Sequence, residues 1–194
     1  MDSVRQLAAM MTVVIAPPLF LSWLLIHPLA SVWRKLGGFA YIFVLLFLVG
    51  AIAGISNLYN ANEDLLYFGT NHITVWLSVP CFIIAVVMAY FYYKYLDLEI
   101  LIGFPEITKD NYPGILLTEG IYSKIRHPRY VGAFFFVLGL AFVANSPITY
   151  MVAVFLIPLI YIVVFFEERE LKKRFGSGYE RYCQEVPKFF PKIF

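Results

Sequence analysis

Two polar segments in the C-terminal half of the chain, residues 118–132 and 165–187, carry the side chains whose types and spacing suggest chemistry. The first contains the triplet Arg126-His127-Pro128. Pro128 suits the first turn of a helix, because a residue there needs no backbone N–H. The free N–H groups and the dipole at a helix N-terminus favour negative charge. Arg126 and His127 beside such a terminus therefore predict an anion site.

The first segment also has a purely structural interpretation, which the sequence leaves open. Arg126 and Arg129 suit cationic anchors at a membrane surface, and Tyr122 and Tyr130 suit an aromatic belt. Composition alone favours neither interpretation over the other.

The second segment begins where a long apolar run meets charged residues. Glu167 and Glu168 lie directly against this run, where an ionised carboxylate is costly without a partner. A solvated helix with ion pairs four residues apart explains the later charges but not Glu167. Pairs of this kind are Glu168–Lys172 and Glu170–Arg174. The pattern therefore favours a functional carboxylate at the membrane interface.

The charged helix should end near Gly176, because glycine commonly follows the last residue of a helix. Tyr179, Tyr182 and Val186 then recur at helical spacing. This spacing predicts a short amphipathic helix that folds back onto the rest of the chain.

Composition indicates which elements must position these segments. Of the 194 residues, 61% are hydrophobic and 14% are charged, against about 45–50% and about 25% in soluble domains. Lipid is therefore the expected solvent, and the predicted fold class is an all-α membrane protein with about five transmembrane helices. The apolar runs that predict these helices are Leu7–Leu29, Phe39–Leu58, Thr74–Leu96, Tyr130–Ala144 and Ile148–Phe166.

Local features refine these spans. Pro17-Pro18 should kink the first helix, which is too long for the apolar core of a signal peptide and is expected to remain uncleaved. The fourth run is short for a full crossing and is followed so closely by the fifth that the two must form a tight hairpin. Gly132 and Gly139 in it allow close approach of a neighbouring helix. We expect a three-span membrane region at residues 1–96, and a second region of loop, hairpin and tail at 97–194.

The distribution of basic residues predicts the orientation. In the five-span arrangement, every Lys and Arg except Arg5 falls on one side of the membrane. Because basic residues are retained in the cytoplasm, the N-terminus is expected outside and the C-terminus inside. Both polar segments then lie on the cytoplasmic face and flank the last hairpin, so they must meet in space.

Several common functions are excluded by what the sequence lacks. The three histidines are scattered and the two cysteines are isolated, so no metal site is expected. The chain contains no H-E-x-x-H, G-x-S-x-G or G-x-G-x-x-G motif. A net charge of +2 with no long basic run argues against nucleic acid as a partner.

Together, the two segments resemble the C-terminal region of the isoprenylcysteine carboxyl methyltransferase family of integral membrane enzymes. The resemblance covers about the last 80 residues, and related regions occur in phospholipid N-methyltransferases and some sterol reductases. The shared pattern is Thr118…Gly120-x-Tyr122-x-x-x-Arg126-His127-Pro128-x-Tyr130-x-Gly132, then Glu167-Glu168-x-x-Leu171-x-x-x-Phe175-Gly176-x-x-Tyr179-x-x-Tyr182-x-x-x-Val186-Pro187. One departure is Val163, where the family pattern has an arginine one helical turn before the glutamate.

The resemblance implies a pocket for S-adenosyl-L-methionine between the hairpin, the preceding loop and the tail. Expected catalytic residues are Arg126, His127 and Glu167. Expected cofactor-binding residues are Gly114, Ile115, Leu116, Leu117, Tyr122, His127, Pro128, Arg129, Tyr130, Glu167 and Glu168. In this scheme Arg126 and His127 hold the methionyl carboxylate, and a glutamate holds the ribose hydroxyls or the methionyl amine.

The expected function is methyl transfer to a lipophilic acceptor at the cytoplasmic membrane face, most specifically to the C-terminal carboxylate of an isoprenylated cysteine. A carboxylate is already ionised at neutral pH, so alignment and exclusion of water matter more than a general base. The alternatives are a methyltransferase for phospholipid amines or small thiols, a reductase that uses NADPH, and a non-enzymatic protein that binds anionic lipid.

Overall fold

The computed structural model describes residues 2–60, 68–69, 71–95 and 115–192, and all regular structure in these ranges is helical. The predicted all-α class is therefore confirmed. The elements are α1 (Asp2–Met10), the π-helical turn η1 (Met11–Ile15), α2 (Ala16–Ile26), α3 (Ala30–Leu36), α4 (Phe39–Asn60), α5 (His72–Tyr93), the 3₁₀ turn η3 (Gly120–Ser123), α8 (Pro128–Ala144), α9 (Pro147–Phe175) and α10 (Ser177–Glu185).

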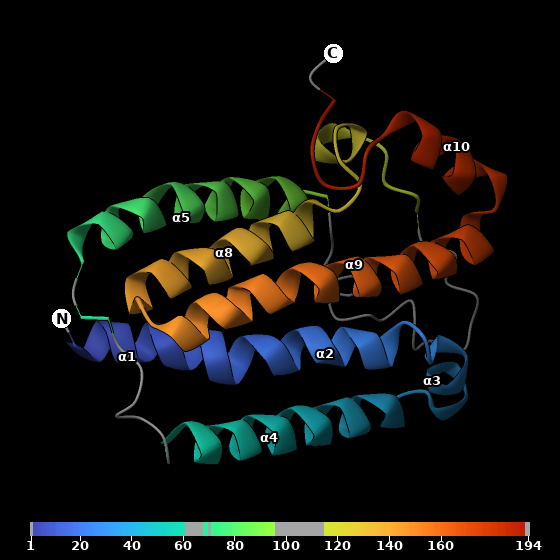
Figure 1. Ribbon diagram of the computed structural model, residues 1–194. Coiled ribbons are helices and arrows are strands. Elements are labelled where there is room, and N and C mark those ends of the chain that lie inside the picture. The colour runs from blue at the N-terminus through green and yellow to red at the C-terminus, as the bar shows by residue number, and fades with distance from the viewer. Residues whose placement is uncertain (1, 61–67, 70, 96–114, 193–194) are drawn as a thin grey trace.

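The long helices lie side by side, with α5 and α8 on one side of α9 and the first helix and α4 on the other (Figure 1). The helices long and apolar enough to cross a membrane are Ser3–Ile26, Phe39–Asn60, His72–Tyr93 and Pro147–Phe175. The remaining long apolar helix, α8, has only 17 residues and extends about 25 Å, less than the roughly 30 Å of a bilayer core. The chain is thus a membrane protein whose five predicted spans are four full-length helices and one short one.

The first helix changes its hydrogen bonding just before its two prolines. The N–H of Ala16 donates to the carbonyl of Met11, five residues back, which is the π-helical pattern. Pro17 and Pro18 have no N–H groups, so the carbonyls four residues before them lose their normal donors. The predicted disturbance of this helix therefore takes the form of a π turn, a recognised source of helix bending.

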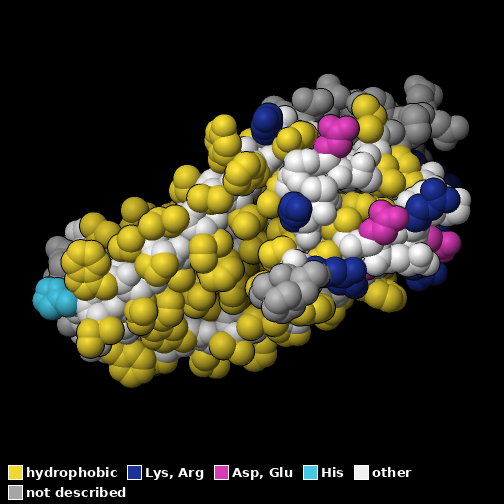
Figure 2. Space-filling model, turned by 90° about the horizontal axis from the view of Figure 1, so that it is seen from above, with side chains coloured by type: hydrophobic (Ala, Val, Ile, Leu, Met, Phe, Trp, Pro, Cys, Tyr) yellow, Lys and Arg dark blue, Asp and Glu magenta, His cyan; other side chains and the backbone are white. Residues whose placement is uncertain are grey.

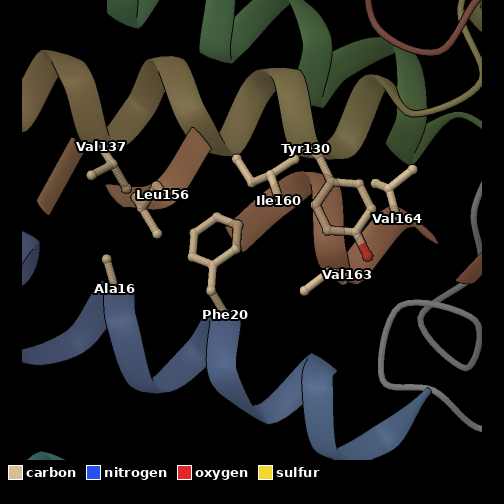
Figure 3. Close-up of a cluster of buried hydrophobic side chains, with 8 residues drawn as sticks. All are labelled: Ala16, Phe20, Tyr130, Val137, Leu156, Ile160, Val163 and Val164. Carbon is tan, nitrogen blue, oxygen red and sulfur yellow. The ribbon is translucent and has the colours of Figure 1, made fainter. Parts of the chain in front are cut away.

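The α8 helix is held closely between its neighbours. A Cβ added at Gly132 would lie 3.0 Å from Met88 Cβ, and one at Gly139 would lie 2.9 Å from the Phe82 ring. The close approach predicted at these two glycines is confirmed, and the neighbouring helix is α5. On its other side, α8 contributes Tyr130 and Val137 to a core shared with α2 and α9 (Figure 3).

The turn between α8 and α9 is tied to distant parts of the chain, which confirms the predicted tight hairpin. Asn145 adopts the left-handed conformation, with φ of 50°, and its Nδ2 donates to the Gly69 carbonyl at 2.9 Å. Arg5 donates to the Ala144 carbonyl from Nε at 3.3 Å and from Nη2 at 3.2 Å. The N-terminal helix therefore satisfies a carbonyl at the C-terminus of α8.

Polar and apolar surfaces are separated along the molecule. Hydrophobic side chains cover most of the face seen in Figure 2, and charged side chains gather at the end where Figure 1 places α10 and the end of α9. At this end Arg34 of α3 forms an ion pair with Glu170 of α9. Glu170 also pairs with Arg174 at 3.6 Å, as its spacing predicts.

Candidate functional site

A cavity at the polar end of the molecule collects both segments singled out by their sequence. Its cavity volume is about 120 Å³, and it is partly open to solvent. It is lined by Trp23, His27, Ile115, Leu116, Leu117, Tyr122, Arg126, His127, Pro128, Arg129, Tyr130, Glu167, Leu171, Arg174, Phe175, Tyr179 and Tyr182. Of the expected site residues, all but Gly114 and Glu168 are in this lining. Gly114 lies outside the described residues.

Glu168 lies beside the cavity and is surrounded by cations. Its Oε1 accepts from Arg126 Nη2 at 2.8 Å and from Arg126 Nε at 3.1 Å. Lys188 lies 2.9 Å from its other oxygen, and His127 Nε2 lies 3.1 Å from Oε1. Glu168 therefore pairs across the fold, instead of with Lys172 on its own helix. A carboxylate so fully engaged acts as a structural anchor.

Arg126 fastens the C-terminal tail with its remaining donors. Its Nη1 donates to the carbonyl of Cys183 at 2.9 Å and to that of Val186. Its backbone N–H donates to the Pro187 carbonyl at 2.9 Å, and the backbone N–H of His127 donates to the Lys188 carbonyl at 3.0 Å. Burial disfavours the charge of Arg126, but the hydrogen bonds and charge of Glu168 outweigh it and raise the pKa of the guanidinium. Arg126 thus joins the loop, α9 and the tail.

Glu167 differs from Glu168 because it lines the cavity and is only partly engaged. Its side chain is 20% exposed, and its Oε2 accepts no hydrogen bond from any described residue. His127 Nδ1 lies 3.7 Å from Oε2, and Arg129 Nη2 lies 3.9 Å from Oε1. A largely buried carboxylate oxygen without a donor is rare in native proteins and indicates a place for a ligand donor.

Arg129 and Tyr130, at the start of α8, line the same cavity as Glu167. Arg129 Nη2 donates to the Tyr130 hydroxyl at 3.0 Å. Its guanidinium carbon lies 4.9 Å from the centre of the Tyr130 ring and 4.3 Å from that of Trp23. These distances fit cation–π contacts. The cationic group is therefore held at the cavity by aromatic rings.

Three further buried tyrosines, Tyr122, Tyr179 and Tyr182, line the cavity. Tyr179 and Tyr182 of α10 pack with Leu116, Leu171 and Val186, which confirms that this helix folds back. The Tyr182 hydroxyl donates to the carbonyl of Tyr122 at 2.6 Å. Burial raises the pKa of all three phenols, so they stay protonated at neutral pH.

The first helix also contributes to the cavity, which was not predicted from the sequence. Trp23 and His27 of this helix stack on each other, with ring centres 5.2 Å apart and planes 22° apart. Their spacing of four residues places them on one helical face. Val163 occupies the position where the family pattern has an arginine. Its side chain is fully buried among apolar side chains of the core.

A second, apolar groove begins at Tyr130, which lines both spaces. Its cavity volume is about 170 Å³, and it runs between α8 and α9. Its lining is Tyr130, Val131, Phe134, Phe135, Ile157, Ile160, Tyr161, Phe189 and Phe190. The site therefore has a charged part and an apolar part that share one tyrosine.

Several known proteins are similar in sequence to part of this chain. A protein-S-isoprenylcysteine O-methyltransferase of Schizosaccharomyces pombe is 36% identical over 87 residues, which are 44% of this chain and 37% of that protein. Protein-S-isoprenylcysteine O-methyltransferase B of Arabidopsis thaliana is 32% identical over 79 residues, 40% of each chain. The Delta(14)-sterol reductase LBR of Gallus gallus is 32% identical over 74 residues, 37% of this chain and 12% of that protein.

The chain spans about two fifths of the length of the two methyltransferases that it matches. No solved structure matches it. The model of the phospholipid methyltransferase family matches residues 73–178, more than half of the chain, and includes α5, α8, α9 and the start of α10. The chain therefore belongs to the phospholipid methyltransferase family.

Proposed function

We propose that this protein transfers a methyl group from S-adenosyl-L-methionine to a lipophilic acceptor at the cytoplasmic membrane face, most specifically to the C-terminal carboxylate of an isoprenylated cysteine. The observation that carries the proposal is Glu167, whose oxygen without a donor lies in a cavity that meets an apolar groove at Tyr130. A charged ligand and an apolar ligand can then meet at one point.

The residues of the polar cavity fit a nucleoside with an amino-acid tail. Glu167 offers an acceptor for ribose hydroxyls or an ammonium group. Arg129 and the N-terminus of α8 suit a carboxylate, whereas Arg126 uses its N–H groups on Glu168 and the tail. Tyr122, like Tyr179, offers an aromatic face to adenine or to a sulfonium.

The apolar groove suits the chain of a lipophilic acceptor. It lies between two apolar helices, and most of its lining is aromatic or branched aliphatic. A prenyl chain gains about 0.8 kcal/mol for each buried CH₂ group. The chain in the groove would bring the acceptor carboxylate to Tyr130, beside the polar cavity.

The chemistry suits a site without a general base. When bound, S-adenosylmethionine supplies a methyl group whose bond to sulfur breaks as a bond to a carboxylate oxygen forms, leaving a neutral thioether and no proton to remove. The acceptor carboxylate is ionised at neutral pH. The protein must then align the two groups and exclude water, and the helices and the tail around the cavity supply such an enclosure.

The names of two relatives support the carboxylate acceptor over a phospholipid amine or a thiol, since both are called protein-S-isoprenylcysteine O-methyltransferases. The cytoplasmic location is supported by the charged end of the molecule, where the basic residues gather. The cavity opens at this same end.

The first experiment is calorimetric titration of S-adenosylhomocysteine into the detergent-purified protein. We expect micromolar binding that Glu167→Gln weakens at least tenfold, because the neutral amide is a poorer acceptor for charged or hydroxyl donors. Glu180→Gln on the exposed face of α10 is the matched control and should bind normally. Folded wild-type protein that binds no S-adenosylhomocysteine would rule out the cofactor assignment.

The second experiment identifies the acceptor. Protein in lipid vesicles is given S-adenosylmethionine with a labelled methyl group and either N-acetyl-S-farnesylcysteine or phosphatidylethanolamine. Base-labile label on the farnesylcysteine indicates an ester and supports the proposal. Label on the phospholipid amine alone would replace the carboxylate acceptor with the amine acceptor.

A further inference from the structure

The wall that α2 contributes to the cavity has no part in the cofactor contacts described above. His27 is 5% exposed and lines the cavity, one helical turn after Trp23. Trp23 stacks on the His27 ring and also lies against the Arg129 guanidinium. The imidazole is thus held by an aromatic ring that is itself fixed by the start of α8.

Neither ring nitrogen of His27 has a hydrogen-bond partner among the described residues. Leaving a buried polar group without a partner costs free energy, so such groups are few in native proteins. Burial without an anionic partner in hydrogen-bond contact favours the neutral imidazole, which has one N–H donor and one acceptor nitrogen. A ligand in the cavity is the natural partner for that donor.

Glu167 Oε2 and the His27 imidazole, which lack hydrogen-bond partners among the described residues, need different ligand groups. Glu167 Oε2 can only accept hydrogen bonds and therefore needs a ligand with donors. His27 can donate and therefore suits a ligand with acceptors. A carboxylate has acceptors only, so it complements His27 and is repelled by Glu167. The two residues thus present different hydrogen-bonding groups to the cavity.

The position of His27 also favours the lipophilic ligand. Trp23 packs against the core cluster that contains Phe20 of α2 and Tyr130 of α8 (Figure 3). Tyr130 lines the apolar groove as well as the cavity. His27 follows directly on Ile26, at the end of the membrane-spanning helix. The residue therefore lies where a group that arrives from the membrane enters the polar cavity.

We propose that His27 is a specificity-determining residue that binds the acceptor carboxylate through its imidazole N–H, with Trp23 as the residue that positions the ring. This inference rests on the proposed function, because it names the contact that its acceptor makes. The first membrane helix is then part of the substrate site as well as part of the scaffold.

The test uses His27→Phe, which keeps an aromatic ring beside Trp23 but removes both nitrogens. Titration of the S-adenosylhomocysteine-bound protein with N-acetyl-S-farnesylcysteine measures acceptor binding without turnover. We expect His27→Phe to weaken this binding about 10- to 100-fold, the range for a lost hydrogen bond to a charged group. The affinity for S-adenosylhomocysteine should stay within threefold of wild type.

Conservative variants and a matched control keep the proposal falsifiable. His27→Asn and His27→Gln each retain one amide donor, and recovery of acceptor affinity in either one is expected. His72→Phe changes an exposed histidine at the other end of the molecule and should have no effect. If His27→Phe binds both ligands normally, or loses S-adenosylhomocysteine binding together with the acceptor, the proposal is wrong. Wild-type protein that binds S-adenosylhomocysteine but neither binds nor methylates farnesylcysteine would instead refute the proposed acceptor.

Discussion

Arg126 donates two hydrogen bonds to a single oxygen of Glu168, from Nη2 at 2.8 Å and from Nε at 3.1 Å. Both side chains are largely buried, at 7% and 12% exposure. Because Arg126 also binds two carbonyls of the tail, the pair links α9, the loop before α8 and the segment after α10. The two adjacent glutamates therefore have separate tasks, with Glu168 holding the enclosure and Glu167 facing its interior.

This division predicts that the two glutamates differ in their effect on stability. Glu168→Gln should destabilise the protein by about 3 kcal/mol, because it leaves a buried guanidinium without its charged partner. Trypsin should then cleave the tail faster, and binding of S-adenosylhomocysteine should fall because α10 no longer closes the cavity. Thermal unfolding in detergent and limited proteolysis measure the two effects. Glu167→Gln is the matched variant and should lose affinity with little change in stability; equal destabilisation of both variants would contradict the division.

Close packing of α8 on α5 gives a second prediction. Gly132→Leu should destabilise the protein by about 1–3 kcal/mol, because a Cβ there already lies 3.0 Å from Met88 and a larger side chain forces the helices apart. Gly50→Leu in α4 is the control, since nothing lies within 4 Å of a Cβ at that position. Unfolding in detergent measures both. A Gly132→Leu variant as stable as Gly50→Leu would show that the two helices do not need this contact.

The sequence predicted the parts of the site whose cause is local. Glu167 could be predicted because an ionised carboxylate beside an apolar run is energetically costly and therefore indicates a function. The helix of residues 177–185 could be found because Tyr179 and Tyr182 have helical spacing and follow a glycine. The hairpin followed from the few residues between two apolar runs.

The remaining features depend on contacts that have no local pattern. Arg126 Nη1 donates to the backbone carbonyls of Cys183 and Val186, and every residue offers such a carbonyl. Trp23 and His27 look like ordinary residues of an apolar span, and only the packing of α2 against α8 and α9 places them at the cavity. Contacts between distant segments could therefore not be predicted from the sequence.

The contact between Arg5 and Ala144 gives a third prediction. Arg5→Met keeps a long side chain but removes both donors to the carbonyl at the end of α8. We expect a loss of about 1–3 kcal/mol, the cost of leaving a buried acceptor without its charged donor. Arg181→Met, on the exposed side of α10, is the control. Unfolding in detergent measures the difference, and equal stability of the two variants would show that the N-terminal helix does not secure the hairpin.

The buried tyrosines predict how stability depends on alkaline pH. Tyr182 has a raised pKa in the folded protein because of burial, whereas a tyrosine in the unfolded chain ionises near pH 10. Its contribution to stability is therefore complete below about pH 10 and is lost as pH rises above that value.

Tyr182→Phe removes the hydrogen bond to the Tyr122 carbonyl, so this variant should be less stable than wild type by about 1 kcal/mol at pH 7. Because it also removes one ionising group, its melting temperature should fall less steeply than that of wild type above pH 10. Parallel curves for Tyr182→Phe and wild type would mean that Tyr182 does not ionise on unfolding.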